Sequence, residues 1–506
     1  MRRFVSFFVV MLVLGAFTAV AQEAGSKATS SKSVQRLNRA PVNKEVLQVK
    51  LPRPFESRLP NGLIVVVLER HKLPTIAATL WVKAGALQDP KDMPGVAEFH
   101  AAMMREGTAT QNSSQIAEAT DAIGAALSTS ASYGQAFTSV SISGLKETAG
   151  KMFSVMADVA LNPIFPAEEL EKFRARKLAQ LQQQRSQPGF LAQEKFRSVL
   201  YGDFPAAVIS ASPESTRAIK VEDLRKFHDA WFAPNNAILG IVGDVAPEEG
   251  MRLATQYFGG WQQKAVPAQS LPPLPAPQPR KVYLIQRPGS VQTNLVAGNL
   301  TLKRTDPDYI PLTVANRILG GGAAARLFIE LREEKGYTYG SYSQFTADIY
   351  PGPFQATSEQ RNNVSKGALD ALLAELRKMR DEPVPSAELE DDKRSLVAAF
   401  ALSLENPANL LSRWLTVKYY GLPQDYWDTF PGKISAVTAA NVQQISRRYI
   451  DMDHLQVVVV GDGGQPAEEQ AGGKTIRDVL GGGDYGPLQV FSAEGKPVPG
   501  GGAPKQ

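Results

Sequence analysis

Two segments far apart in the chain share one pattern of apolar residues. Residues 217–244 align without a gap onto residues 435–462. In each segment apolar residues recur at helical spacing, and a short apolar run then ends in Gly-Asp, at Gly243 and Asp244 in the first copy. A helix followed by a buried strand, repeated within a chain of 506 residues, predicts two homologous α+β domains rather than one large core.

Composition supports a division near the middle of the chain. Six prolines fall within residues 263–280, and such a stretch favours an extended, semi-rigid connector. We therefore predict six segments in chain order. They are a signal peptide (1–21), a flexible lead-in (22–50), an N-terminal domain (51–262), a Pro-rich linker (263–280), a C-terminal domain (281–465) and a Gly- and Pro-rich tail (466–506).

The first residues have the pattern of an export signal. Arg2 and Arg3 precede an apolar run, and Ala19 and Ala21 then form an A-x-A cleavage site. The run is shorter than the roughly 20 residues that a membrane span needs, so we expect cleavage after Ala21 and a periplasmic or secreted protein. An uncleaved membrane anchor is the alternative. The sequence contains no Cys, so neither lipid attachment to a leader Cys nor disulfides can form, and stability must come from core burial.

Charge and hydropathy exclude two classes of partner. The net charge of +5 reflects a slight excess of Lys and Arg, and no dense basic run occurs. This pattern does not indicate nucleic-acid binding. After the leader no apolar stretch is long enough to cross a bilayer, so we expect no membrane span in the mature chain.

Residues 94–108, PGVAEFHAAMMREGT, form the most informative helix of the first half. Its residues fall into two stripes at helical spacing. One stripe consists of Val96, Phe99, His100 and Met103, and the other of Glu98, Ala101 and Ala102.

This helix resembles the motif helix of the insulinase, pitrilysin and mitochondrial processing peptidase family of zinc peptidases. In that family the segment reads roughly G-x-A-H-F-x-E-H-M-x-x-x-G-T. The resemblance implies that Glu98, Ala101 and Ala102 stand where the family has a His ligand, a Glu general base and a second His ligand. The chain thus has the peptidase frame with a degenerate metal motif, so we expect no catalytic residue and no metal on it.

The family's third ligand is a Glu on a long helix, roughly 75 to 80 residues further on. The best match is Gln180, and residues 172–193 contain no carboxylate. The four histidines do not form a pair at i and i+4, and His100 is expected to be a core residue. Glu98 alone would be one weak ligand or a solvated carboxylate. We therefore expect no cofactor on this chain and zinc only on a partner.

Residues 319–342, LGGGAAARLFIELREEKGYTYGSY, resemble a second signature of the same family, L-G-G-G-x-x-S-R-L-F-x-x-L-R-E-x-x-G-x-x-Y. The resemblance implies that Arg332 and Tyr339 bind the substrate backbone. The alternative is a surface ion pair for Arg332 and core packing for Tyr339. Because no Gly-Lys-Ser/Thr follows the glycines, a nucleotide site is not indicated.

The resemblance implies two α+β domains, each a mainly antiparallel sheet with helices packed on it, that form half of a clamshell. Some two-domain bacterial members work as pairs of unlike subunits. The leading hypothesis is an exported non-catalytic subunit that forms a heterodimer with a zinc-bearing homologous subunit, the two acting on unfolded peptides or small proteins. The alternatives are a non-proteolytic scaffold or interaction protein, and an active peptidase with an atypical metal site.

Overall fold

The structure is a computed structural model that describes residues 50–469 and 473–498. The predicted signal peptide and all but the last residue of the predicted lead-in lie outside the described residues.

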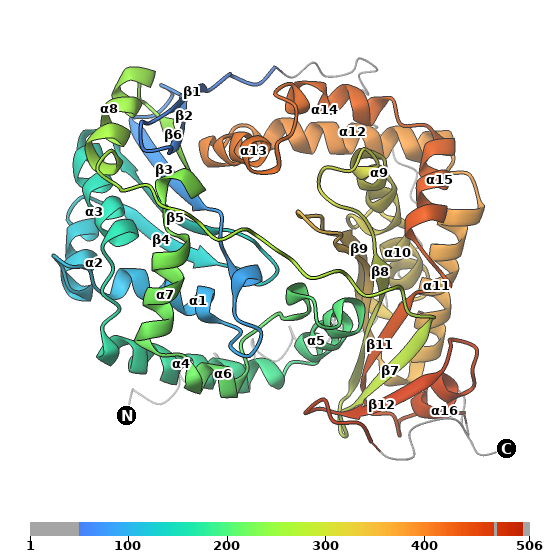
Figure 1. Cartoon of the computed structure of the whole chain (residues 1–506). Helices are drawn as coiled ribbons and strands as arrows, with labels where there is room; N and C mark the ends of the chain where they lie inside the picture. The colour runs from blue at the N-terminus through green and yellow to red at the C-terminus, as the bar shows by residue number, and fades with distance from the viewer. Residues whose placement is uncertain (1–49, 470–472, 499–506) are drawn as a thin grey trace, which may run out of the picture. The chain divides into compact units, whose positions relative to one another are not determined.

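One six-stranded sheet is built from the first half of the chain. Its strands are β1 (Phe55–Arg58), β2 (Ile64–Glu69), β3 (Thr75–Val82), β4 (Ala126–Ala131), β5 (Thr138–Leu145) and β6 (Ala237–Gly243). They lie in the order β1-β2-β6-β3-β5-β4 (Figure 1). Only β2 and β6 pair in parallel, and all other neighbours are antiparallel. The sheet is therefore mixed and mainly antiparallel, as predicted.

The second half of the chain repeats this plan. Its strands are β7 (Lys281–Gln286), β8 (Gln292–Leu300), β9 (Thr338–Phe345), β10 (Pro353–Arg361), β11 (Gln456–Gly461) and β12 (Leu488–Ser492). Their order is β12-β7-β11-β8-β10-β9, and β7 runs parallel to both β11 and β12. Strands β6 and β11, which end the two aligned segments of the sequence, thus hold the same place in the two sheets. The predicted pair of homologous α+β domains is confirmed.

Helices connect these strands, and most of them follow one another without a strand between them. Those of the first half are α1 (Val96–Met103), α2 (Ser113–Asp121), α3 (Ala149–Leu161), α4 (Ala167–Arg185), α5 (Pro188–Tyr201), α6 (Pro213–Ala218), α7 (Val221–Trp231) and α8 (Pro247–Phe258). Those of the second half are α9 (Tyr309–Gly320), α10 (Arg326–Phe328), the π-helical turn η7 (Ile329–Glu334), α11 (Ser365–Asp381), α12 (Ser386–Ser403), α13 (Pro407–Tyr420), α14 (Tyr426–Ser435), α15 (Ala439–Tyr449) and α16 (Ile476–Gly481). Short 3-10 turns are η2 (Ala86–Gln88), η3 (Met104–Glu106), η4 (Lys146–Thr148), η5 (Pro205–Ala207), η6 (Pro234–Asn236) and η8 (Asn362–Val364). No helix in residues 50–469 and 473–498 is long and apolar enough to cross a membrane.

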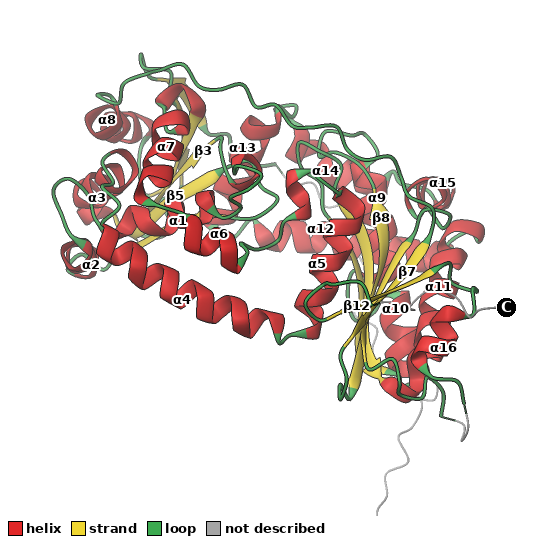
Figure 2. Cartoon of the chain, turned by 60° about the horizontal axis from the view of Figure 1, so that its bottom comes forward, coloured by secondary structure: helices red, strands yellow, loops and turns green. Residues whose placement is uncertain are grey.

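The two halves exchange one helix each. Helix α5 follows α4 after a short turn and packs on β8 and β11 of the second sheet (Figures 1 and 2). Helix α13 packs in return on β2 and β6 of the first sheet. Glycines make room for both contacts, because a Cβ at Gly240 would lie 2.8 Å from Leu411 of α13, and one at Gly298 would lie 2.9 Å from Phe196 of α5. Part of each sheet is therefore covered by a helix from the other half of the chain.

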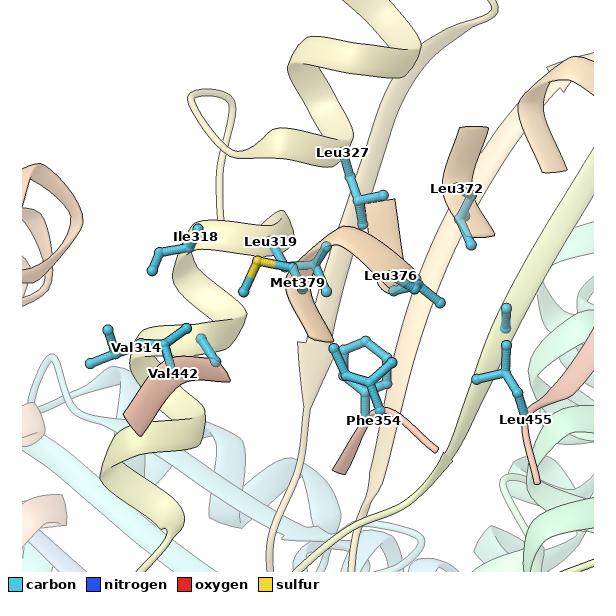
Figure 3. Packing of buried hydrophobic residues seen from close by; sticks show 14 of the residues in the cluster. Val314, Ile318, Leu319, Leu327, Phe354, Leu372, Leu376, Met379, Val442 and Leu455 are labelled. Atoms are coloured by element: carbon cyan, nitrogen blue, oxygen red, sulfur yellow. The ribbon is translucent and has the colours of Figure 1, made fainter. Parts of the chain in front are cut away.

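The second half contains a continuous apolar core. Residues of α9 (Val314, Ile318 and Leu319) and of α11 (Leu372 and Leu376) belong to one buried apolar cluster, part of which is drawn in Figure 3. All five side chains are buried, and burial of this kind contributes about 1.5–3 kcal/mol for each large apolar side chain. This core fixes α9, and with it the start of the second signature.

The segments predicted to be a linker and a tail differ in their secondary structure. Residues 263–280 contain no helix or strand. The segment 466–506 was expected to be a tail, yet α16 and β12 lie within it, and β12 forms the edge of the second sheet. A five-residue strand between Gly- and Pro-rich stretches gives too short a periodic signal to be found in the sequence.

Candidate functional site: a degenerate metal motif and an exposed Arg–Tyr pair

Helix α1 buries one of its two stripes completely. Val96, Phe99, His100 and Met103 are all between 0% and 2% exposed, which confirms His100 as a core residue. On the other stripe, Ala101 is buried, and Glu98 and Ala102 are partly buried. The positions of the degenerate motif therefore share one face of the helix, as the spacing predicts.

The start of α1 is held by Asp89 rather than by its own N-cap. The Asp89 carboxylate accepts hydrogen bonds from the backbone N–H groups of Gly95 (2.7 Å) and Ala97 (2.8 Å). Gly95 has a φ of +109°, and a Cβ there would lie 2.9 Å from Ala211, so only glycine fits easily. Burial raises the pKa of Asp89 to about 7, although the two backbone bonds act in the opposite direction.

Each oxygen of the Glu98 carboxylate is bound by one neighbouring side chain. Its Oε1 lies 2.5 Å from the Nζ of Lys177 on α4, and its Oε2 accepts a hydrogen bond of 2.7 Å from the hydroxyl of Tyr133. The Lys177 side chain is 4% exposed and that of Glu98 is 26% exposed. Burial, followed by the charge of Glu98, raises the pKa of Tyr133, so the phenol remains a donor. These three side chains, which we name the Glu98 network, join α1, α4 and the loop after β4.

Lys177, not Gln180, is the residue that α4 presents to the motif helix. Gln180 is exposed, and Lys177 lies nearly one turn earlier and at the near end of the spacing expected for the third ligand. The sequence does indicate which face of α4 points toward the core. Leu170, Lys177 and Leu181 form one stripe at helical spacing, and all three are buried. Gln180 lies off that stripe.

These residues do not fit a zinc ion. A catalytic zinc takes three protein ligands and keeps one position open. Ala101 and Ala102 offer only methyl groups, and the one carboxylate, Glu98, already binds an ammonium. Within residues 50–469 and 473–498, no cluster of three or more His, Cys, Asp or Glu could hold a metal ion.

Two histidines that are far apart in the sequence meet behind α1. The Nε2 of His100 lies 3.0 Å from the Nδ1 of His228 on α7, and Phe165, Phe227 and Phe232 surround the His100 ring. Burial, followed by the charge of His228, lowers the pKa of His100 well below its ordinary value. Burial likewise lowers the pKa of His228 to about 3. Since their facing nitrogens bond to each other, the pair serves as neutral core rather than as a pair of metal ligands. Spacing along the chain gave no sign of this contact.

The second signature places Arg332 and Tyr339 side by side at the surface. Arg332 lies in the π-helical turn η7, its Nη1 donates a 3.0 Å hydrogen bond to the carbonyl of Tyr339, and its guanidinium stacks 5.0 Å from the Phe328 ring. Tyr339 is 85% exposed. The alternative of core packing for Tyr339 is therefore wrong, and Arg332 makes no ion pair with the described residues. π-Helical turns are frequent at functional sites.

The three glycines of this signature have a packing role. A Cβ at Gly320 would lie 2.2 Å from the backbone nitrogen of Ser343, so the helix end and β9 require glycine there. Arg317 donates to the carbonyl of Gly321 at 2.8 Å and pairs with Asp392. Among the described residues no hydrogen bond or ion pair links this region to the Glu98 network.

Two homologous sheet domains, a motif helix without its ligands and an exposed Arg–Tyr pair define a peptidase-like protein of the inactive type. The family model described as "Insulinase (Peptidase family M16)" matches residues 65–213, and the model described as "Peptidase M16 inactive domain" matches residues 218–396. The chain belongs to the insulinase family of peptidases, M16.

Individual relatives agree with this assignment. The chain is 22% identical over 413 residues to the uncharacterized zinc protease YmxG of Bacillus subtilis, covering 80% of this chain and 98% of that one. A structure of a peptidase M16 inactive domain from Pseudomonas fluorescens is similar with a TM-score of 0.77 and 28% identity, over 83% of this chain and 99% of that one. A protease from Helicobacter pylori shares the fold, with a TM-score of 0.76 at 17% identity, over 81% of this chain and 100% of that one.

Proposed function

We propose that this protein is an exported, non-catalytic subunit of a heterodimeric zinc peptidase, and that it presents Arg332 and Tyr339 to peptides at the partner's zinc site. The observation that carries the proposal is the exposure of both side chains. A phenol that is 85% exposed contributes little to the core of this chain and is free to contact a peptide.

The pair has the right chemistry for a peptide backbone. A guanidinium offers up to five N–H donors and a phenol offers one O–H donor, and both suit a carbonyl oxygen that gains negative charge. The bond from Arg332 to the Tyr339 carbonyl uses one of these donors and fixes the guanidinium beside β9. The remaining donors stay available for a peptide, either unfolded or part of a small protein.

The missing half of the site would come from a homologous subunit with an intact H-x-x-E-H motif. At the degenerate motif, both oxygens of Glu98 are bound by Lys177 and Tyr133 and Ala101 carries no carboxylate, whereas peptide hydrolysis by zinc needs a group that activates water. Residues 218–396 match a domain model described as inactive, which supports this division of labour.

The test is reconstitution of the mature chain with a zinc-bearing M16 subunit from the same cell envelope, followed by cleavage of an unfolded peptide. Arg332→Ala and Tyr339→Phe should each lower kcat/KM by about 10²–10³, the usual effect of losing one stabilising donor. Tyr342→Phe, three residues along β9 and 44% exposed, is the matched control and should leave the rate unchanged.

Three results would contradict the proposal. Full activity of a complex carrying Arg332→Ala and Tyr339→Phe would remove their role in binding. A stable complex with no cleavage under any condition would favour the scaffold alternative. Turnover by the purified chain alone, with zinc bound to it, would make it an active peptidase with an atypical site.

A further inference from the structure

A buried ammonium occupies the degenerate motif. Lys is almost never fully buried unless it is paired, because removing its charge from water is costly. Lys177 is nevertheless only 4% exposed, on the face of α4 that meets α1. The compensation comes from Glu98, whose other oxygen is bound by Tyr133. One positive charge is thus held by one carboxylate at the junction of two helices.

This arrangement has the connectivity of a metal site, although its cation is part of the chain. A metal joins side chains from separate helices through one central charge. Here the Lys177 ammonium makes that connection between α4 and α1, and Tyr133 completes the shell from the loop after β4. A second cation close to it would be repelled, because two positive charges about 4 Å apart cost about 4 kcal/mol near a protein surface.

We infer that Lys177 is a built-in substitute for the metal ion. It stands where α4 would offer the third ligand and places a positive charge there instead, so zinc remains excluded even when the three motif residues on α1 are restored. The inference concerns this chain by itself and does not depend on the proposed partner. It predicts that four residues together prevent zinc binding, and not only the three within the motif. They are Glu98, Ala101, Ala102 and Lys177.

Zinc content of two purified variants tests the inference. The first variant carries Glu98→His, Ala101→Glu and Ala102→His, and the second adds Lys177→Glu. After equilibration with zinc and desalting, the second variant should retain about one equivalent and the first should retain no more than the unsubstituted chain. Equal retention by the two variants, at one equivalent or at none, would overturn the inference.

A second measurement covers the case in which the multiple variants do not fold. Lys177→Met leaves the Glu98 carboxylate without its cation, and Glu98→Gln leaves the ammonium without its carboxylate. If the pair is the internal cation site, the double variant Glu98→Gln/Lys177→Met should melt at a higher temperature than either single variant. The matched control is the exposed pair Glu168 and Lys172 on α4. Glu168→Gln and Lys172→Met should change the melting temperature independently of each other. Independent effects at Glu98 and Lys177 would also overturn the inference.

Discussion

Arg174 of α4 and Lys393 of α12 make the same bond in the two halves of the molecule. Arg174 donates to the carbonyl of Ile219 at 2.8 Å, and Lys393 donates to the carbonyl of Val437 at 3.1 Å. Ile219 and Val437 are equivalent residues of the repeated segment. Each cation also pairs with a Glu three residues earlier on its helix. The duplication therefore extends beyond the apolar pattern to a single polar contact. In each half it joins a long helix to a residue shortly before α7 or shortly before α15.

Lys393→Met should lower the free energy of unfolding by about 1.5–3 kcal/mol, because the hydrogen bond that it removes is made by a charged donor. Lys393 is 7% exposed, so water cannot replace its contact with the Val437 carbonyl. Urea denaturation of the single variant measures the effect. The neighbouring Arg394→Met, at a cation that is 40% exposed, should change stability by less than about 1 kcal/mol. Equal effects of the two substitutions would mean that the repeated hydrogen bond contributes no more to the free energy of unfolding than an exposed ion pair does.

The pair His100 and His228 should make the protein sensitive to acid. The folded pKa of each His lies below its unfolded value near 6.5, so the stability that each neutral ring contributes is present above that pH and is lost as the pH falls. The slope is at most about 1.4 kcal/mol per pH unit for each group. For His228 the window runs from about pH 6.5 down to its folded pKa of about 3.

His228→Phe should flatten this dependence, and urea midpoints measured at several pH values between 4 and 7 would show it. Phe is suited to the site because the His228 ring already stacks on Phe232 at 4.5 Å. His71→Gln is the comparison, since carboxylates raise the pKa of the exposed His71 and its contribution has the opposite sign. An unchanged slope in His228→Phe would show that the buried pair is not the source of the acid sensitivity.

In the same pH window, the contribution of Asp89 to stability should change with pH in the opposite direction to that of the two histidines. Its folded pKa of about 7 lies above its ordinary value of 3.8, so its contribution to stability is full below that ordinary value and is lost as the pH rises through about 7. Asp89→Asn removes this opposing slope. The variant should therefore lose stability more steeply than the unsubstituted protein when the pH falls from 7 to about 4. Parallel curves for the two proteins would contradict the raised pKa.

Gly298 and Gly240, which lie against the exchanged helices, should differ sharply in how well they tolerate substitution by alanine. A Cβ at Gly298 would lie 2.0 Å from the backbone oxygen of Phe354, which cannot move without breaking the sheet. At Gly240 the nearest atoms are the flexible ends of Leu411 and Leu415. Gly298→Ala should therefore cost about 3 kcal/mol or more, and Gly240→Ala about 1–2 kcal/mol.

Coupling distinguishes the two sites further. Gly240→Ala combined with Leu411→Ala should cost less than the sum of the two single changes, by about 0.5–3 kcal/mol, because the shorter side chain makes room for the added methyl group. Denaturation of the four proteins of this cycle measures the coupling. Additive effects would show that α13 does not press on β6 at this point.

The sequence was sufficient for features that depend on local periodicity. The repeated helix–strand segment predicted two similar domains, and the two stripes of α1 predicted which of its residues are buried. The phase of α4 was harder, because this helix is polar on most sides and only Leu170, Lys177 and Leu181 mark its inner face. The prediction followed spacing to Gln180, whereas burial selects Lys177. Spacing within a family motif fixes a position only to about one helical turn.

Contacts between distant segments could not be read from the chain. His100 and His228 meet because α7 packs on α1, across 128 residues of sequence. The exposure of Tyr339 likewise depends on β9 lying at the free edge of its sheet. The identity of Arg332 and Tyr339 was available from a motif, but their geometry required the fold.

The exchange of α5 and α13 has a consequence for synthesis of the protein. The ribosome completes β6 at Gly243, yet the helix that covers this part of the first sheet is made only when Tyr420 has been added. Nascent chains between these lengths carry an open apolar sheet face. Final packing of the first half therefore waits for the second, and a gene fragment cut within the linker at residues 263–280 would encode a first half whose sheet lacks the cover of α13.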